Sequence, residues 1–487
     1  MGLKTEIARA NIIFTGGRFI SAAIGFFFSI ILARILQPYN FGLYSFCIVI
    51  VSFFILFTDL GLNSTLIRFV AKNMKLEERR KVSSIIKSIF KYKIALTMST
   101  GIIVSIFSEQ VSLLIFNKPE AGFIVFLAGF VLIGNSLFAF FESLFTGLKK
   151  FSILSGIQIS QNIFRFIFVI GLVVLGMSVS GAITGLILSY VLMVVASMVI
   201  VYKKYNFIVS ERETMFDRRD MLTFSAWVFM YSIVNTIYAV IDQLMISAML
   251  PLESVGFYKI SNTWAWSIIY LVPIASQVLY PYFSSSTNRD QMKTMFSNSL
   301  KYSSIFIFPL AFLLSAFSGP LILFLYKASF TVASEALRIM AFVSIPIVIS
   351  MILATYFTGA KKPEIIAKIL FIMMILNIIF NYFLIQLYGI SGAAIATLIA
   401  KSTETAILFI IIILVQKLTF KPSILIKPLI ASIFMYFVAL FFLPNVTNYL
   451  TFAIYGVLSL LIYAAIMLVI GGLRKEEFLT IRKLLKF

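Results

Sequence analysis

Amide and basic side chains form one polar face within an otherwise apolar segment at 153–175. They recur at the spacing of a helix and are Gln158, Gln161, Asn162 and Arg165. An ionised side chain at the centre of a bilayer costs about 2.5–3.5 kcal/mol, so such a face needs a cavity or a partner. Arginine can bind phosphate oxygens through two hydrogen bonds, and amides can bond sugar hydroxyls in either direction. The face therefore suits a ligand with phosphate and sugar groups, and a polar network between helices is the alternative.

A second candidate for an anion contact is Arg18, in the apolar segment at 11–36. Small and polar residues follow it at helical spacing, among them Ser21 and Gly25. Such a stripe is typical of an aqueous cavity or a close helix interface, so we expect Arg18 to face inward. Arg34 lies on the other side of the same segment, near its end, where a long side chain can reach the membrane surface.

Further charged residues in the apolar segments are candidates for ion coupling or gating. They are Asp59, Asp242, Lys401 and Glu404. Asp59 lies at a depth close to that of Arg18, so it could instead form a buried ion pair. Lys401 and Glu404 could pair with each other, because they lie three residues apart on a helix. Asn235 lies seven residues before Asp242 on the same helix face and is predicted to contribute to the ligand-binding cavity.

The residue types that are missing exclude several kinds of chemistry. The chain has no histidine and one cysteine, Cys47. Serine–histidine–aspartate triads, histidine-ligated zinc and intramolecular disulfides are therefore excluded. The sequence contains no G-x-x-x-x-G-K-[ST] phosphate loop, so this chain holds no ATP-driven motor of that type. We expect no metal and no cofactor, and a proton or sodium gradient is the candidate energy source.

The elements that must position these side chains are membrane helices. Of the 487 residues, 61% are hydrophobic and 12% are charged, whereas about a quarter are charged in soluble proteins. Apolar runs of the roughly 20 residues needed to cross a bilayer recur along the whole chain. The sequence thus predicts an all-α integral membrane protein with fourteen transmembrane helices. These are expected at 11–36, 41–62, 84–107, 121–144, 153–175, 180–202, 221–249, 255–283, 298–317, 336–358, 364–388, 391–415, 424–443 and 449–471.

The basic residues follow the positive-inside rule. The net charge is +21. Outside the predicted spans, 32 lysines and arginines fall on one side of the predicted membrane and three on the other, the largest group running from Arg68 to Lys93. Both termini are therefore predicted to lie in the cytoplasm. We expect a multi-pass protein of the cell membrane, that is, the plasma or inner membrane. Because membrane topology explains the basic charge, nucleic acid is not expected as a partner.

Short sequence matches indicate an internal repeat. The segment FTGLKK at 145–150 returns as FTGAKK at 357–362, and SGAITGLILSY matches the later SGAAIATLIAK. LQPYNFGLY also matches LPLESVGFY, which aligns Gly42 with Gly256. Each repeat unit holds six predicted helices. Because this number is even, both halves enter the membrane in the same direction and are parallel.

The repeat divides the chain into four parts. An N-terminal lobe with helices 1–6 covers 1–205, and a cytoplasmic linker covers 206–220. A C-terminal lobe with helices 7–12 covers 221–415, and two added helices with a basic cytoplasmic tail cover 416–487. Parallel halves of this kind are expected to face each other across a central cavity.

Three motifs carry a family resemblance: GGRFISAAIGFFFSIILARILQPYNFGLYSF, TDLGLNSTLIRFVAK and FTGLKKFS. Together with the two lobes they resemble polysaccharide biosynthesis flippases of the multidrug/oligosaccharidyl-lipid/polysaccharide exporter superfamily. The resemblance implies lobes similar to those of multidrug exporters and of flippases for peptidoglycan precursor. It further implies that alternating access moves a polyprenyl-diphosphate-linked oligosaccharide from the cytoplasmic to the outer leaflet, with Arg18 of GGRF at the diphosphate. The implied partners are this lipid-linked oligosaccharide, membrane lipids and polysaccharide assembly proteins.

Two other functions stay open. A cation-coupled multidrug antiporter of the same superfamily would have a cavity dominated by acids, which Arg18 and Arg165 disfavour. A membrane glycosyltransferase or polymerase would place acidic catalytic residues in large external loops. The predicted external loops are short, so we expect a transporter and not an enzyme.

Overall fold

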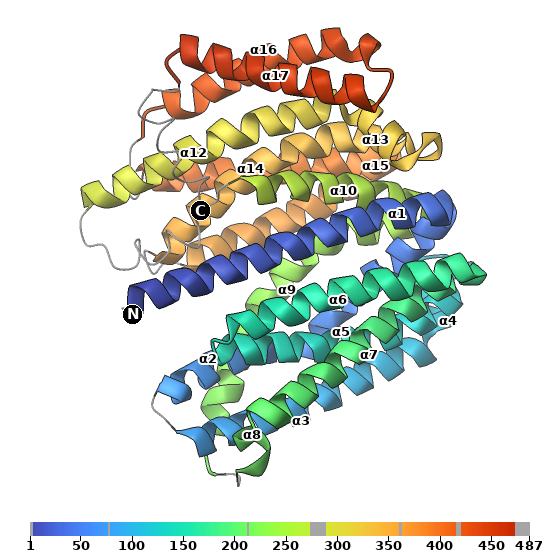
Figure 1. Ribbon diagram of the computed structural model, residues 1–487, viewed down its shortest axis with the longest axis vertical. Coiled ribbons are helices and arrows are strands. Elements are labelled where there is room, and N and C mark those ends of the chain that lie inside the picture. The colour runs from blue at the N-terminus through green and yellow to red at the C-terminus, as the bar shows by residue number, and fades with distance from the viewer. Residues whose placement is uncertain are drawn as a thin grey trace. The chain divides into compact units, whose positions relative to one another are not determined.

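The computed structural model describes residues 3–75, 78–211, 214–272, 289–359, 363–414 and 420–472 (Figure 1). Helices account for nearly all of this part of the chain, and it holds no β-strand. The chain divides into two compact units, Met1–Gly256 and Phe257–Phe487. Each unit consists of long apolar helices, as the composition predicts.

Long helices, with two short helices of three and four residues between them, form the first unit. They are α1 (Leu3–Asp59), α2 (Leu62–Lys75), α3 (Arg79–Ile106), α4 (Ser108–Gln110), α5 (Gly122–Gly147), α6 (Phe151–Leu172), α7 (Ser178–Lys204), α8 (Phe207–Ser210), α9 (Arg218–Met249) and the start of α10 (Leu252–Leu271). Helix α3 packs against α5, α6 packs against α7, and α1 packs against α6. Buried aromatic residues such as Phe140 and Phe145 fill the core between α2, α3, α5 and α7. The seam between α1 and α6 positions most of the candidate site.

The second unit continues from α10 with a similar set of helices. They are α12 (Arg289–Ala316), α13 (Ser318–Tyr326), α14 (Ala333–Gly359), α15 (Pro363–Leu414), α16 (Ser423–Phe442) and α17 (Tyr449–Val469). Helices α14 and α15 pack against each other, and α16 packs against α12 (Figure 1). The Tyr463 hydroxyl donates a hydrogen bond of 2.9 Å to the carbonyl of Ile305. The last two helices are thus held against α12 through a small buried core.

Ten helices among the described residues are long and apolar enough to cross a membrane. Three of these spans are 40, 54 and 51 residues long, far more than the roughly 20 that one crossing needs. They are Ile20–Asp59, Phe151–Lys204 and Glu364–Leu414. Each is kinked at a residue with positive φ. These residues are Gln37 (62°), Gly176 (90°) and Gly389 (57°).

The FTGLKK segment ends a helix, as the repeat suggests. The Lys149 amide donates to the carbonyl of Thr146 and the Lys150 amide to that of Phe145, at 2.9 and 2.8 Å. Lys149 has φ 58°, so the chain reverses there and α6 begins one residue after Lys150. In the second copy, α14 ends at Gly359 and the following three residues lie outside the described part of the chain.

Helix α9 lies in the first unit, where it packs against α1 and α2. Helix α10 starts beside α1, and the two backbones nearly touch. A Cβ atom on Gly42 would overlap the carbonyl of Leu252, and one on Gly256 would lie 3.1 Å from the Gly42 nitrogen. The two glycines that the repeat aligns therefore lie in contact with each other. The domain division predicted from the repeat, with a linker at 206–220, stays a prediction.

Candidate functional site

The polar face of α6 is held in place by contacts to α1. The Arg165 Nη2 group donates a hydrogen bond of 2.8 Å to Asn162 Oδ1 on the preceding turn. The guanidinium lies over the ring of Phe28 on α1, with 4.7 Å between Cζ and the ring centroid. A cation over an aromatic face is attracted by the ring, more strongly where water is excluded. The arginine is thus fixed in one orientation before any ligand binds.

Helix α1 approaches α6 closely along this face. A Cβ atom on Gly25 would lie 3.2 Å from Arg165 Nη2, and one on Gly17 would lie 2.6 Å from Ser155 Cβ. Larger side chains at either position would displace α6 or the guanidinium. The small residues that precede and follow Arg18 in the sequence therefore serve a close helix interface.

The face continues towards α5 through a second contact. Gln158 Nε2 donates a hydrogen bond of 2.7 Å to Glu142 Oε1 on α5. Tyr190 on α7 lies near enough to both Glu142 and Arg165 to interact electrostatically with each. We call the set of Glu142, Gln158, Gln161, Asn162 and Arg165 the α5–α6 polar seam.

Several buried polar atoms of this seam have no hydrogen-bond partner among the described residues. They are Gln158 Oε1, Gln161 Nε2 and Arg165 Nε. Buried polar groups in folded proteins are nearly always hydrogen-bonded, to protein or to ordered water. The seam therefore keeps one acceptor and two donors for water or for a ligand.

Arg18 lies in α1, but its side chain is outside the part of the structure that is described. Its neighbour Gly17 faces Ser155 on α6, so the backbone at this point runs along the same interface. The predicted anion contact of Arg18 stays a prediction.

Asp59 forms an ion pair with Lys93 at the end of α1. Lys93 Nζ lies 3.0 Å from Asp59 Oδ1, and the side chains are 1% and 26% exposed. The backbone N–H of Asn63 donates a hydrogen bond of 3.2 Å to the same oxygen. One turn along α3 from Lys93, a buried chain of hydroxyls joins Thr97 to Ser136 and Ser136 to Thr58.

Lys93 corrects one expectation from the sequence. The sequence pattern places it in the cytoplasmic basic group that begins at Arg68, whereas the structure buries it in the helix bundle. It belongs to a buried stripe of α3 with Ile86, Ile89 and Thr97, at spacings of three and four residues. That spacing is the signal in the sequence from which its burial could have been inferred.

The remaining candidates lie on α9 and in the second unit. Asn235 and Asp242 are both half-buried on α9. Lys401 Nζ lies 2.8 Å from Glu404 Oε2, and their side chains are 19% and 6% exposed. Lys401 and Glu404 therefore pair with each other, which is the alternative that their spacing of three residues allows. In the described residues, no group of three acidic, histidine or cysteine side chains could hold a metal ion.

Comparisons with known proteins agree with this architecture. A family described as "Polysaccharide biosynthesis protein" matches residues 31–335. The chain is 24% identical over 400 residues to an uncharacterised membrane protein of Methanocaldococcus jannaschii, covering 78% of each. It is 27% identical over 196 residues to the probable low-salt glycan biosynthesis flippase Agl15 of Haloferax volcanii, covering 39% of this chain and 41% of that one.

A solved structure has the same fold. The lipid II flippase MurJ in an inward closed conformation superposes with a TM-score of 0.75 at 21% identity. The superposition covers 94% of this chain and 98% of that one. The chain is therefore a multi-pass membrane protein with the fold of this flippase.

Proposed function

Because the chain belongs to the polysaccharide biosynthesis protein family, we propose that it is a flippase for a lipid-linked glycan. The proposed cargo is a polyprenyl-diphosphate-linked oligosaccharide, moved from the cytoplasmic to the outer leaflet. The similarities to a glycan biosynthesis flippase and to the fold of a lipid II flippase support it. The observation that carries it is the α5–α6 polar seam, which keeps unsatisfied guanidinium and amide groups inside a membrane bundle.

The proposed architecture has fourteen crossings in two parallel halves, with both termini in the cytoplasm. The kinks at Gln37, Gly176 and Gly389 divide the three longest spans, and α10 adds a crossing to the ten apolar ones. Gly176 and Gly389 also occupy similar places, just before the matched SGA segments of the two halves. The contact between Gly42 and Gly256, which the repeat aligns, further supports the pseudo-symmetry.

In this function the polar seam recognises the head of the cargo. The Arg165 guanidinium would bind diphosphate oxygens, because Asn162 and Phe28 already hold it in place and its Nε donor is unused. Gln158 and Gln161 would bond sugar hydroxyls, since an amide can both donate and accept. Arg18 and Asn235 are proposed as further contacts. Most of the lipid chain stays in the bilayer while the two lobes alternate between inward and outward openings.

Multidrug antiport is disfavoured because most of the acidic candidates in the bundle are already paired with lysines. Two of the three acidic candidates, Asp59 and Glu404, are each paired with a lysine. A cationic drug would have to displace an ammonium group at either position.

Transport by purified protein in liposomes tests the proposal. With fluorescent polyprenyl-diphosphate oligosaccharide in the outer leaflet, we expect translocation without lengthening of the glycan. A proton gradient and a sodium gradient are then imposed in separate experiments. The gradient that raises the initial rate of translocation identifies the coupling ion. Movement of cationic dyes without movement of the glycan would exclude the proposed function, and glycan lengthening would show an enzyme.

Arg18 is tested in cells that lack their own flippase. We expect Arg18→Ala to abolish complementation at an unchanged membrane level of the protein, because it removes a proposed diphosphate contact. Arg34→Ala, on the same helix, is the matched control and should complement. Full complementation by Arg18→Ala would remove Arg18 from the proposed site.

A further inference from the structure

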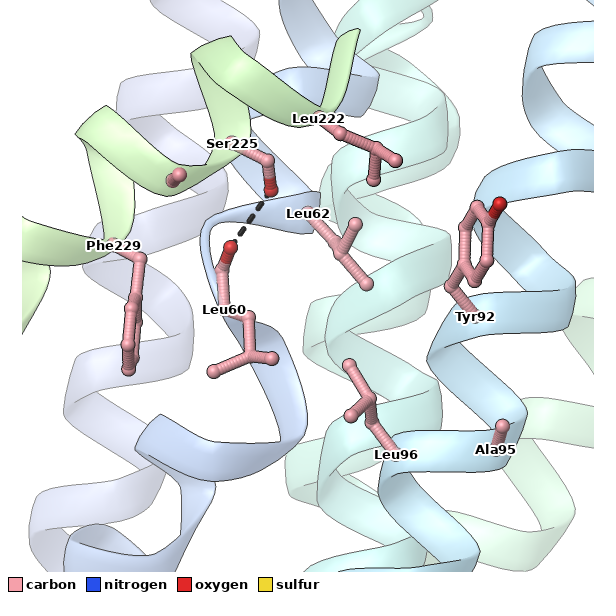
Figure 2. A pocket seen from close by; sticks show the side chains of 9 residues that line it. Leu60, Leu62, Tyr92, Ala95, Leu96, Leu222, Ser225 and Phe229 are labelled. Carbon is pink, nitrogen blue, oxygen red and sulfur yellow. Dashed lines mark hydrogen bonds between the residues drawn. The ribbon is translucent and has the colours of Figure 1, made fainter. Parts of the chain in front are cut away.

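An apolar pocket of about 400 Å³ lies between α3, α9 and the turn that joins α1 to α2 (Figure 2). Leu62 and Ser225 form its buried floor, at 3% and 4% exposure. Tyr92 on α3 and Leu222 on α9 stand at its exposed rim. All of these residues belong to the first unit, so the pocket is formed within one compact body.

The helix is interrupted beside the pocket, but the backbone carbonyl of Leu60 is still hydrogen-bonded. The chain takes positive φ at Leu60 (44°) and Gly61 (79°), where the helix is interrupted. The Ser225 hydroxyl donates a hydrogen bond of 2.7 Å to the freed Leu60 carbonyl, as Figure 2 shows. Because this carbonyl is satisfied within the protein, the pocket favours a hydrocarbon occupant over water.

The pocket lies within apolar membrane helices, and basic residues mark one end of it. On α3, Lys91 is exposed and lies one turn before Ala95, a lining residue. Lys87 lies a further turn back, and its Nζ donates to the carbonyls of Val209 and Glu211 in the connection after α7. The predicted topology places that connection in the cytoplasm.

An arginine on α2 adds to this positive end. Arg68 is exposed, and its guanidinium lies over the ring of Phe224 on α9, 4.1 Å from the centroid. The pocket thus has apolar walls and a cationic end. This arrangement complements an amphiphile with an anionic head and a hydrocarbon chain.

The dimensions of the pocket admit a branched chain. Along α9 it extends from Leu222 to Phe229, which is about 10 Å at 1.5 Å per residue. A volume of about 400 Å³ has room for a few units of a methyl-branched isoprenoid chain.

We propose that this pocket binds a segment of the isoprenoid chain of the lipid-linked cargo while its anionic head lies at the basic end. The proposal rests on the flippase function proposed above. It gives the protein a contact with the lipid part of the cargo in addition to the contacts of the polar seam with the head.

Photocrosslinking tests the pocket without requiring transport. A polyprenyl monophosphate with a diazirine on its chain is added to the full chain in liposomes. We expect labelling of α3 and α9 peptides around Leu96 and Phe229, and unlabelled polyprenyl monophosphate should suppress it. Equal labelling by a phosphatidylglycerol with the same diazirine would show a general site for bilayer lipid and overturn the proposal.

A variant that fills the pocket provides the second test. Leu96→Trp should lower the labelling by about tenfold, because it removes space for a few chain carbons. Ile103→Trp is the matched control, since Ile103 is exposed on α3 outside the pocket, and it should be labelled as the parent is. Ala226→Phe, at an exposed rim position of α9, gives the same reading if Leu96→Trp does not fold. Parental labelling of both filling variants would overturn the proposal.

Flux measurements separate this proposal from the proposed function. Leu96→Trp should raise the KM for long-chain cargo by about tenfold and leave that for a short-chain analogue unchanged. A parent protein that is labelled specifically but moves no glycan would refute the flippase function and retain the pocket. A parent that moves glycan but shows no specific labelling would refute the pocket alone.

Discussion

Arg165 is held before it binds anything, and this decides what its substitution should do. Its Nη2 bonds Asn162 and its guanidinium lies over Phe28, so little side-chain freedom remains to be lost on binding. Lysine keeps the charge but cannot reproduce the planar fork. At this position, geometry should therefore matter as much as charge.

We expect Arg165→Lys to lower glycan flux by at least about tenfold, since one charge-assisted hydrogen bond contributes about 1.5–3 kcal/mol. Arg34→Ala, in a different part of the bundle, should retain near-parental flux. Initial rates in liposomes at matched protein content provide the measurement. A Lys variant as active as the parent would show that only the charge at this position matters.

The pair of Asp59 and Lys93 makes a prediction about stability. Lys93→Met leaves the carboxylate of Asp59 in the bundle without its cation. Removing one partner of a buried pair costs about 3–5 kcal/mol. Because Asp59 is partly exposed, we expect a smaller loss of about 1–3 kcal/mol, seen as a lower midpoint of thermal unfolding in detergent.

The double variant Lys93→Met with Asp59→Asn is the matched control, because it removes both charges. It should recover most of the lost stability. Recovered stability with lost transport would give the charged pair a role in transport in addition to its role in stability. A double variant no more stable than Lys93→Met would contradict the ion-pair explanation.

The sequence predicts which site residues share a face of one helix better than it predicts their partners on other helices. The face of Gln158, Asn162 and Arg165 follows from helical spacing alone, and the structure shows contacts along it. The partners Phe28, Glu142 and Lys93 lie on other helices. Which faces meet depends on packing and kinks, and spacing along one helix does not encode these.

Among the elements, the contact of α1 with α10 depends on the absence of side chains. Gly42 and Gly256 let the two backbones approach within ordinary contact distance. A methyl group on Gly42 would overlap the carbonyl of Leu252, which is backbone and cannot rotate away. The helices would have to separate.

We therefore expect Gly42→Ala to destabilise the protein by about 1–3 kcal/mol, the usual range for overpacking. Gly156→Ala is the control, because nothing lies within 4 Å of a Cβ atom at that exposed site in α6. Alanine there should stabilise by up to about 1 kcal/mol through helix propensity. Thermal unfolding of both variants in detergent should thus show shifts of opposite sign, and equal shifts would contradict the close contact.

Element boundaries were predictable where glycine interrupts an apolar run. The predicted boundaries at 175–180 and 388–391 contain Gly176 and Gly389, the two kinks of the long helices. The helix predicted at 41–62 ends close to the interruption at Leu60 and Gly61. The α2 helix that follows was not predicted, because its residues are amphipathic and not apolar. The packing of α9 with the first unit also could not be predicted, since it depends on contacts across the 206–220 linker.

At the scale of the whole molecule, the topology is open to direct test. Cys47 is the only cysteine and is buried, so the native chain should not react with a membrane-impermeant maleimide. Met215, in the connection before α9, is fully exposed, and Leu450 at the start of α17 is also exposed. They lie on opposite sides of the predicted membrane.

Met215→Cys should be labelled only in inside-out vesicles, and Leu450→Cys only in intact cells. This outcome would place the termini in the cytoplasm, as the distribution of basic residues predicts. Labelling of both positions from the same side would contradict the predicted number of crossings between them. The parent chain serves as the unlabelled control.

The contact between Gly42 and Gly256 also has an evolutionary consequence. On the proposed duplication, both descend from one position of an ancestral six-helix chain. Two copies of that chain paired about a twofold axis would have placed the position against itself, as in isologous dimers. A single glycine codon would then have removed the side chain from both sides of the interface. After fusion each side had to keep its own glycine, so one mutational target became two.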